Sequence, residues 1–268
     1  MIITQKHVLS PWLRIYQPRP KATARIVCLP HAGGTASFFR DWNRYLPGNI
    51  ELVAIQYPGR QERLDDELIN NMAALTEELA EEIRPLLDRP YILFGHSMGA
   101  AVCHELCLLL TQRRLRLPER LIVSAREAPM HNLTGRLHLA PDSIFCEKLS
   151  SLGNTPPELL HSDEWRKLML PVIRNDYQLI ETYQPTQQSA PMPIRISAFV
   201  GSKDNELTIA QAADWSAVTS KPFELRIFEG DHFYLCERCA PVVTEAIRSF
   251  QLQLLNLSSD AKTWPSTP

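Results

Sequence analysis

The pentapeptide Gly95 to Gly99, GHSMG, places a serine between two glycines directly after the apolar run YILF. The pattern G-x-S-x-G is typical of a serine on a sharp turn between a strand and a helix, where a Cβ in place of either glycine would collide with neighbouring backbone. YILF fits a buried strand, and the small apolar residues of MGAAVCHELCLLL fit a helix. Ser97 is therefore the candidate nucleophile, and a glycine turn without chemistry is the alternative.

A serine hydroxyl becomes a nucleophile only when a positioned base removes its proton. In α/β-hydrolases a carboxylate and then a histidine follow the serine along the chain. Of the histidines after Ser97, only His232 stands in a loop between an expected strand and an expected helix, in FEGDHFYL. His232 is therefore the candidate base.

Several carboxylates could orient that histidine. Asp204 follows the expected strand IRISAFV, at the sheet edge where the serine should lie. Glu206 is its nearest competitor. Asp231 adjoins the histidine in sequence but should point away from its ring, and Glu127 follows an earlier strand. We favour Asp204.

The tetrahedral intermediate of acyl transfer needs two backbone N–H groups aimed at its oxyanion. One is expected from Met98, the residue after the nucleophile. The other should come from the loop after an early strand, where RIVCL is followed by PHAGGTASFF and two glycines permit close approach. Ala32 is the expected second donor, and a plain turn at HAGG is the alternative.

Six short apolar runs are typical of strands, and helical patterns separate them. They cover residues 25–29, 51–56, 91–94, 121–125, 194–200 and 223–228. Strands that alternate with helices imply a mostly parallel central sheet flanked by helices, the α/β class. We expect a single domain over residues 1–268.

One interval breaks the alternation. Residues 130–188 contain no good strand but have helical stretches at 143–152 and 163–183, and Pro171 should interrupt the second. A helical insertion between two strands should sit as a lid over one edge of the sheet. The polar tail, residues 256–268, is expected to fray.

Composition narrows the classes of function. The 268 residues carry a formal net charge of −2 with basic residues scattered among acidic ones, so nucleic acid is not an expected partner. The chain has neither an apolar run of membrane-spanning length nor a secretory signal, which predicts a cytoplasmic protein without membrane contact. Cys236 and Cys239 form a C-x-x-C pair without the further ligands that a metal site needs, so no metal is expected.

Six motifs follow one another along the chain: LPHAGGTASFF, YPGRQER, FGHSMGA, SAREAP, GSKD and GDHFYL. With these motifs the sequence resembles, from about residue 13 to about residue 250, the type II thioesterases that accompany nonribosomal peptide and polyketide synthetases, in the α/β-hydrolase superfamily. The combination of HAGG, PGR and GHSMG separates this group from general lipases, many of which carry HGGG. Asp231 and Glu127 depart from the usual residues of the family, and neither is in the expected triad.

The resemblance implies an α/β-hydrolase fold with a helical lid. It assigns Ser97 as nucleophile, His232 as base and Asp204 as orienting acid, with the N–H groups of Met98 and Ala32 as the oxyanion hole. The implied reaction is hydrolysis of stalled or wrongly primed acyl groups from the phosphopantetheine arm of carrier domains. That arm belongs to the partner, so the enzyme itself should need no cofactor.

Four residues are candidates for substrate contact. Arg60, in the PGR motif, is at least as well explained by a structural ion pair. Leu168, Val172 and Leu179, on the expected insertion, are candidates to line an acyl chamber, although packing in the core explains them better.

Other functions remain open at this point. A carboxylesterase or lipase acting on small oxygen esters would use the same triad, and a hydrolase-like binding protein would have the fold without catalysis. A thioesterase domain embedded in a synthetase is a third alternative. Because the chain starts with its own methionine and carries no carrier domain, we expect a stand-alone monomer that docks transiently on acyl or peptidyl carrier domains and also accepts small acyl thioesters.

Overall fold

A seven-stranded, mostly parallel sheet forms the centre of the computed structural model, which describes residues 10–132, 134–153, 155–187 and 190–248. The strand order is β1-β3-β2-β4-β5-β6-β7, and only β1 runs antiparallel to its neighbour. The strands are β1 (Leu13–Arg14), β2 (Ala24–Leu29), β3 (Ile50–Ile55), β4 (Tyr91–His96), β5 (Arg120–Ser124), β6 (Arg195–Gly201) and β7 (Phe223–Phe228). All six expected strands are present, and β1 adds a short edge strand.

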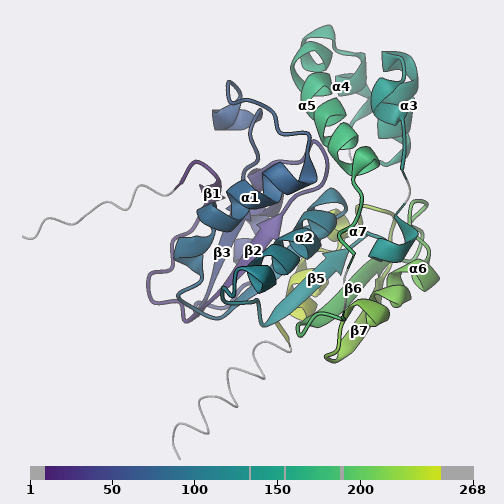
Figure 1. The fold of residues 1–268 in the computed structure, drawn as a ribbon. Coiled ribbons are helices and arrows are strands. Elements are labelled where there is room, and N and C mark those ends of the chain that lie inside the picture. The colour runs from purple at the N-terminus through teal and green to yellow at the C-terminus, as the bar shows by residue number, and fades with distance from the viewer. Residues whose placement is uncertain (1–9, 133, 154, 188–189, 249–268) are drawn as a thin grey trace, which may run out of the picture.

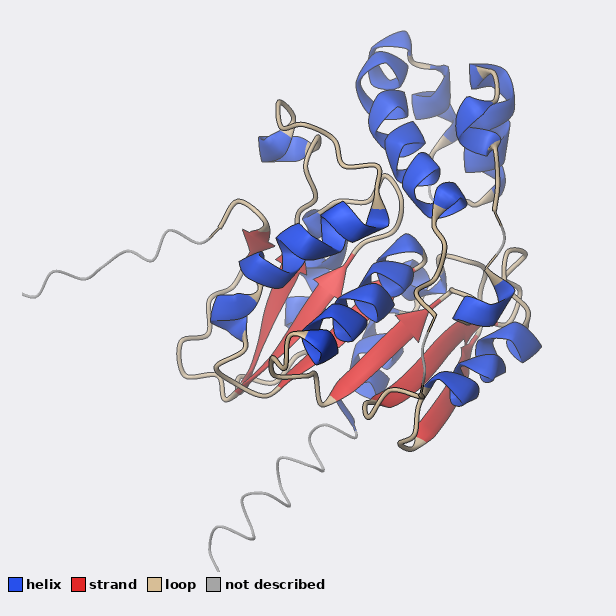
Figure 2. Ribbon diagram, viewed as in Figure 1, coloured by secondary structure: helices blue, strands red, loops and turns tan. Residues whose placement is uncertain are grey.

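Helices cover both faces of this sheet (Figures 1 and 2). One face packs against α1 (Met72–Glu82) and α2 (Met98–Gln112), and the other against η1 (Ala36–Arg44) and the helical residues 239–248. Because β2, β3 and β4 are buried on both faces, their sequences are mostly apolar rather than alternating, and the charged Arg25 of β2 pairs with Glu51 of β3. The shorter helical elements are η2 (Gln61–Arg63), η3 (Arg84–Leu86), α6 (Ile209–Ala213), η6 (Asp214–Val218) and α7 (Tyr234–Glu237).

A separate group of helices lies between β5 and β6 in the chain. It consists of η4 (Pro129–His131), η5 (Leu137–Leu139), α3 (Asp142–Ser151), α4 (Pro157–His161) and α5 (Asp163–Thr182). In Figure 1 α3, α4 and α5 stand together beyond the end of the sheet toward which the strand arrows of Figure 2 point. They share a small apolar core centred on Phe145, which is fully buried.

The expectation that Pro171 interrupts the long helix of this group is wrong. α5 runs unbroken through the proline for 20 residues, and the Ser162 side chain caps its start by accepting the N–H of Trp165 at 3.3 Å. A proline inside a helix costs about 3 kcal/mol. Burial of the apolar residues on either side of it, Leu170 and Val172, favours the continuous helix, because packing contributes most of a helix's stability in a protein.

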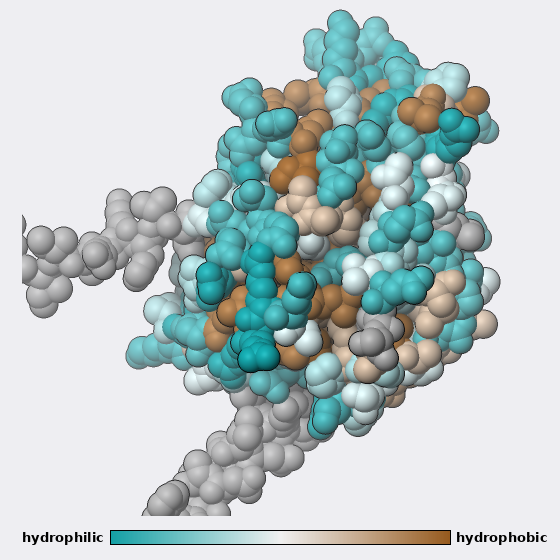
Figure 3. All heavy atoms as spheres, viewed as in Figure 1, coloured by the Kyte–Doolittle hydropathy of each residue, from teal (hydrophilic) through white to brown (hydrophobic). Residues whose placement is uncertain are grey.

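The surface of the helical group carries exposed apolar side chains. Leu139, Ile144, Leu159 and Leu168 are each more than two-fifths exposed, and Figure 3 shows apolar surface among the hydrophilic residues at that end of the molecule.

Within the described ranges no helix has both the length and the apolar character needed to cross a bilayer. Positions 133, 154 and 188 of the expected insertion, and the expected tail 256–268, lie outside the described residues.

Two glycines set the distance between β4, α2 and β2. A Cβ on Gly95 would lie 2.2 Å from the carbonyl oxygen of Gly99, and a Cβ on Gly99 would lie 2.2 Å from the carbonyl oxygen of Leu29. Both contacts are with backbone, which cannot move aside without shifting the turn at Ser97. The glycines of GHSMG therefore permit a close strand-to-helix approach that no other residue allows.

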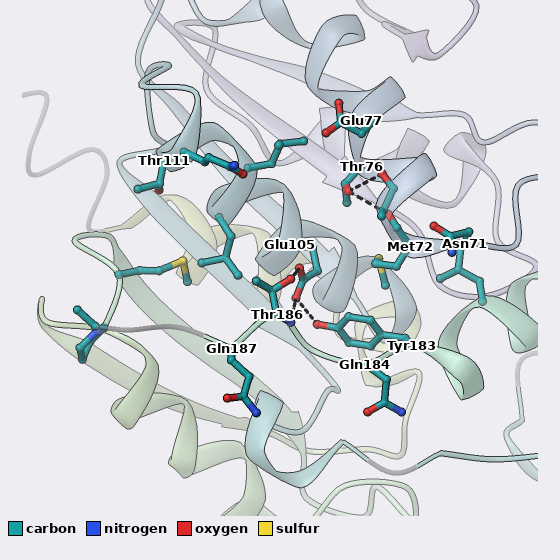
Figure 4. A pocket seen from close by; sticks show the side chains of 18 of the residues that line it. Asn71, Met72, Thr76, Glu77, Glu105, Thr111, Tyr183, Gln184, Thr186 and Gln187 are labelled. Atoms are coloured by element: carbon teal, nitrogen blue, oxygen red, sulfur yellow. Dashed lines mark hydrogen bonds between the residues drawn. The ribbon is translucent and has the colours of Figure 1, made fainter.

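Glu105 of α2 holds the chain that leaves α5. Its carboxylate accepts the Tyr183 hydroxyl at 2.5 Å and the hydroxyl and N–H of Thr186 at 2.6 and 3.1 Å (Figure 4). Burial alone would raise the pKa of Glu105, but these hydrogen bonds and one from His104 outweigh it and lower the pKa from 4.5 to about 2. A hollow of about 980 Å³ opens beside this network, between α1, α2 and the end of α5.

Gly95→Ala should destabilise the fold, because the added methyl group would overlap the backbone of Gly99. Overpacking of this kind costs about 1–3 kcal/mol. Chemical denaturation measures the loss. Gly48→Ala is the matched control, because nothing lies within 4 Å of a Cβ at that position; equal stability losses in the two variants would contradict the argument.

Glu105→Gln should remove a contribution to stability that depends on pH. Because folding lowers the pKa of Glu105 from 4.5 to about 2, the ionised carboxylate stabilises the fold above about pH 4.5, and this stabilisation disappears as the pH falls toward 2. Unfolding free energies of wild type and variant should differ by roughly 1–3 kcal/mol at pH 7 and by less at pH 3. A constant difference would contradict the linkage. The exposed Glu78→Gln serves as control and should change stability little at either pH.

Candidate active site

Ser97 occupies a strained turn between β4 and α2. Its φ of 53° and ψ of −115° are uncommon for a residue with a Cβ. Its N–H donates to the carbonyl oxygen of Ser124 at 2.8 Å, which fixes the turn against the end of β5. Ser97 is partly exposed, whereas the residues on either side of it are buried. The local structure is the strand, turn and helix that the GHSMG motif predicts.

Asp204 and His232 meet beyond the ends of β6 and β7. Nδ1 of His232 lies 3.0 and 3.1 Å from the two carboxylate oxygens of Asp204. The carboxylate also accepts the N–H of Glu206 at 2.8 Å, and its side chain is fully buried. When the Nδ1–H of His232 donates a hydrogen bond to the Asp204 carboxylate, Nε2 of the same ring is unprotonated and can accept a proton.

Close backbone contacts bring the two loops together. The N–H of Lys203 donates to the carbonyl oxygen of Gly230 at 2.8 Å. A Cβ on Gly201, the last residue of β6, would lie 2.2 Å from the carbonyl oxygen of Asp231. Glycine at the end of β6 therefore lets Asp204 reach His232, and GSKD and GDHFYL act as one structural unit.

The competing carboxylates are engaged elsewhere. Glu206 pairs with a lysine of α3, and Glu127 pairs with the arginine before it at 3.0 Å. Asp231 accepts the N–H of Phe233 at 2.8 Å. Of the four carboxylates considered, Asp204 is the one that hydrogen-bonds to the ring of His232.

Two histidines that sequence reasoning missed pack next to His232. The ring of His96 lies 5.4 Å from that of His232, and the ring of His31 lies 5.8 Å from that of His96, between centroids. Burial is the main cause that lowers both pKa values, and the pKa of His31 falls to about 3 with smaller contributions from His232 and Arg60. Both rings are therefore neutral at pH 7. They stand in HAGG and GHSMG and precede Ser97 in the chain, whereas the base of an α/β-hydrolase follows its serine.

Two backbone N–H groups are available to an oxyanion. In the HAGG loop, the N–H of Gly33 donates to Asp176 at 2.7 Å and that of Gly34 to the carbonyl oxygen of His31 at 2.9 Å. The N–H of Ala32 has no acceptor among the described residues. Met98 begins α2, and the first N–H groups of a helix have no partner within it.

A cavity of about 90 Å³ adjoins Ala32 and Gly33. α5 contributes residues spaced four apart to its wall: Trp165, Met169, Ile173 and Tyr177. Apolar residues Leu149 and Leu152 of the α3 region and Phe233 complete much of the rest. The cavity is therefore bounded on one side by the oxyanion loop and on the other by the helical group.

The four residues named as candidates for substrate contact lie outside this cavity. Leu168 and Val172 precede Met169 and Ile173 and point elsewhere, because each step along a helix turns by about 100°. Leu168 is 49% exposed, and Leu179 belongs to the main core beneath α5. Arg60 is 1% exposed, and its guanidinium forms an ion pair with Asp176. Its position therefore fits a structural ion pair better than contact with substrate.

Residues 24–250 match the family model described as "Thioesterase domain". The chain belongs to the thioesterase family. This thioesterase is 37% identical to the gramicidin S biosynthesis protein GrsT of Aneurinibacillus migulanus, over 85% of this chain and 90% of that protein. It is 36% identical to thioesterase PikA5 of Streptomyces venezuelae, over 84% of this chain and 80% of that protein.

Solved structures of type II thioesterases are similar to this thioesterase. BorB from the borrelidin biosynthetic cluster aligns with a TM-score of 0.81 and 36% identity, over 88% of this chain and 96% of that chain. YbtT from the yersiniabactin pathway aligns with a TM-score of 0.79 and 32% identity, over 88% and 97%. The resemblance to type II thioesterases and the expected α/β-hydrolase fold are confirmed. The protein is an enzyme, a hydrolase of acyl thioesters.

Asp204→Asn should lower kcat by about 10³–10⁴-fold, because an amide no longer holds the His232 tautomer that accepts the serine proton. Steady-state hydrolysis of a small acyl thioester measures the effect. Glu206→Gln is the matched control, since its side chain pairs with Lys148 and not with His232, and it should keep activity close to wild type. Equal losses in the two variants would contradict the role given to Asp204.

Proposed function

We propose that the enzyme removes stalled or aberrant acyl groups from the phosphopantetheine arm of carrier domains in a nonribosomal peptide or polyketide pathway. The observation that carries this proposal is the position of Ser97 and the hydrogen-bonded pair His232–Asp204 at one sheet edge, next to an apolar cavity. The similarity to GrsT and YbtT, which are named for gramicidin S and yersiniabactin biosynthesis, supports a carrier-bound substrate.

The first half of the reaction transfers the acyl group to the enzyme. Oγ of Ser97 attacks the thioester carbonyl carbon while Nε2 of His232 accepts the hydroxyl proton and Asp204 stabilises the resulting imidazolium. The N–H groups of Met98 and Ala32 stabilise the oxyanion of the tetrahedral intermediate. The carbon–sulfur bond then breaks, and the thiol of the arm leaves with the proton from His232.

The second half returns the enzyme to its starting state. Water, deprotonated by Nε2 of His232, attacks the acyl-serine carbonyl, and the same two N–H groups stabilise the second oxyanion. Collapse of that intermediate breaks the bond to Oγ of Ser97, which regains its proton from His232. The products are the free acid and a carrier arm with its thiol restored.

The helical segment within residues 130–188 serves as a lid on the single catalytic domain, 1–268. It supplies one wall of the 90 Å³ cavity, where the acyl group would lie away from water. The exposed apolar residues of this segment suit transient contact with a carrier domain. The reactive arm comes with that partner, so the enzyme works without a cofactor. In this proposal it acts as a monomer in the cytoplasm.

Ser97→Ala should abolish release of acyl groups from loaded carrier domains, with a loss of at least about 10³-fold, because no other group supplies the nucleophile. A panel of acyl groups on carrier domains, assayed with wild type and variant together, measures this. The exposed Ser216→Ala is the control and should match wild type.

A nitrophenyl ester tests the leaving group in the same experiment. The triad itself accepts both sulfur and oxygen leaving groups, so equal or faster turnover of the oxygen ester would favour a carboxylesterase. Unchanged thioester hydrolysis by Ser97→Ala would instead contradict a mechanism that passes through an acyl-Ser97 intermediate.

A further inference from the structure

We propose that Asp176 and Arg60 form a positioning pair that holds the oxyanion loop, residues 30–35, in its catalytic shape and ties it to the helical lid. Asp176 lies on α5, inside the lid segment, and Arg60 lies in the PGR motif after β3. The inference rests on the proposed function, because it assigns the pair a task in the oxyanion hole to which Ala32 contributes.

Asp176 contacts the loop directly. Its Oδ2 accepts the N–H of Gly33 at 2.7 Å, and the same oxygen accepts Nη1 of Arg60 at 2.7 Å. Oδ1 accepts Nη2 of Arg60 at 2.9 Å, which makes the ion pair bidentate. The side chains are 4% and 1% exposed, so the contact is shielded from water and its geometry is narrowly defined.

Arg60 closes the arrangement from the other side. Its Nη1 also donates to the carbonyl oxygen of Gly34 at 3.1 Å, and its Nε donates to that of Pro58 at 3.1 Å. Gly33 and Gly34 are thus held through an N–H by Asp176 and through a carbonyl by Arg60. The peptide group between residues 32 and 33 and the one between residues 34 and 35 are thereby fixed in orientation.

Packing of α5 on the loop adds a second constraint. Gly33 has a φ of +74°, and a Cβ there would lie 2.7 Å from Cγ1 of Ile173. Ile173 and Asp176 are three residues apart and therefore share one face of the helix. One face of α5 thus supplies an apolar contact and a hydrogen bond to the glycine loop, and an ion pair to Arg60, which itself donates to that loop.

This arrangement has two consequences for the oxyanion hole. Because the N–H of Gly33 is directed at Asp176, it is not available to substrate, and the N–H of Ala32 is left as the donor of this loop. Because the carboxylate is paired with a guanidinium, it orients the loop without placing net negative charge beside a developing oxyanion. A lone carboxylate in the same place would oppose the reaction.

Asp176→Asn tests the proposal, because the amide cannot accept from both nitrogens of Arg60 and from Gly33. The concentration of competent sites is first measured by titration of Ser97 with a fluorophosphonate. Per titrated site we expect kcat on a small acyl thioester to fall about 10–100-fold, with KM changed by less than about twofold. Affinity for a trifluoromethyl ketone, whose serine adduct carries an oxyanion, should weaken by a similar factor.

Glu181→Gln is the matched control. Glu181 is a carboxylate near the end of α5 that accepts the N–H groups of Leu137 and His138 at 2.9 Å, and these partners of its side chain belong to the lid segment. It should lose stability and keep both kcat per titrated site and affinity for the ketone. If Asp176→Asn behaves in the same way, the pair is structural only and the proposal is overturned.

Asp176→Glu covers the case in which the asparagine variant does not fold. It keeps the charge opposite Arg60 but lengthens the side chain by one methylene, which displaces the oxygen from the N–H of Gly33. Wild-type kcat and ketone affinity in folded Asp176→Glu would overturn the proposal. A failure of the proposed function would give a different result. In that case Ser97→Ala would still hydrolyse thioesters, whatever the Asp176 variants do.

Discussion

The parallel pairing of six neighbouring strands, from β3 to β7 across the sheet, is the constraint on which the site depends. The register aligns Leu29 with Gly95 and Gly201 with Phe228, so the chain leaves β2, β4, β6 and β7 at one edge of the sheet. Ala32 and His232 stand 200 positions apart in the sequence numbering, yet the rings of His31 and Phe233 lie 4.8 Å apart. A shift in any one strand pairing would carry one participant away from the others.

Backbone shape at this edge is maintained by burial beneath it. Ser97 adopts a positive φ, and the adjoining glycines accept contacts that would exclude a Cβ. Such conformations cost of order 1–3 kcal/mol each and persist only where surrounding structure determines them. Here β4 is fully buried, and α2 packs its small residues Ala100 and Ala101 into the main core. The core therefore stabilises the turn that presents Ser97, the proposed nucleophile.

The sequence predicts those features that follow from burial on both faces and from chain order. Five of the six main strands are almost wholly buried, whereas β7 is only partly buried, and the triad candidates follow three of the six. The two residues of β1 carry too little pattern to be recognised, and their pairing with β3 is decided by tertiary contacts. What packs against α5 also decides that the helix continues through Pro171. The same packing decides that Met169, and not Leu168, faces the cavity.

Asp176 shows where a sequence signal existed without being sufficient. An acidic residue between the apolar residues Ile173 and Leu179 predicts a buried carboxylate with a cationic partner, because an unpaired buried charge is too costly. The sequence cannot name that partner, since Arg60 lies 116 residues away and meets it only after the sheet and the lid have assembled.

This pairing also divides α5 into two functional halves. Its C-terminal half is fixed to the catalytic domain at Asp176 and, just beyond its end, through Tyr183 to Glu105. Trp165 and Met169, in the N-terminal half, line the cavity and lie beyond these anchors. If the cavity receives the acyl group as proposed, we expect the N-terminal half of α5, with α3 and α4, to adjust to acyl groups of different size while residues 30–35 keep their shape.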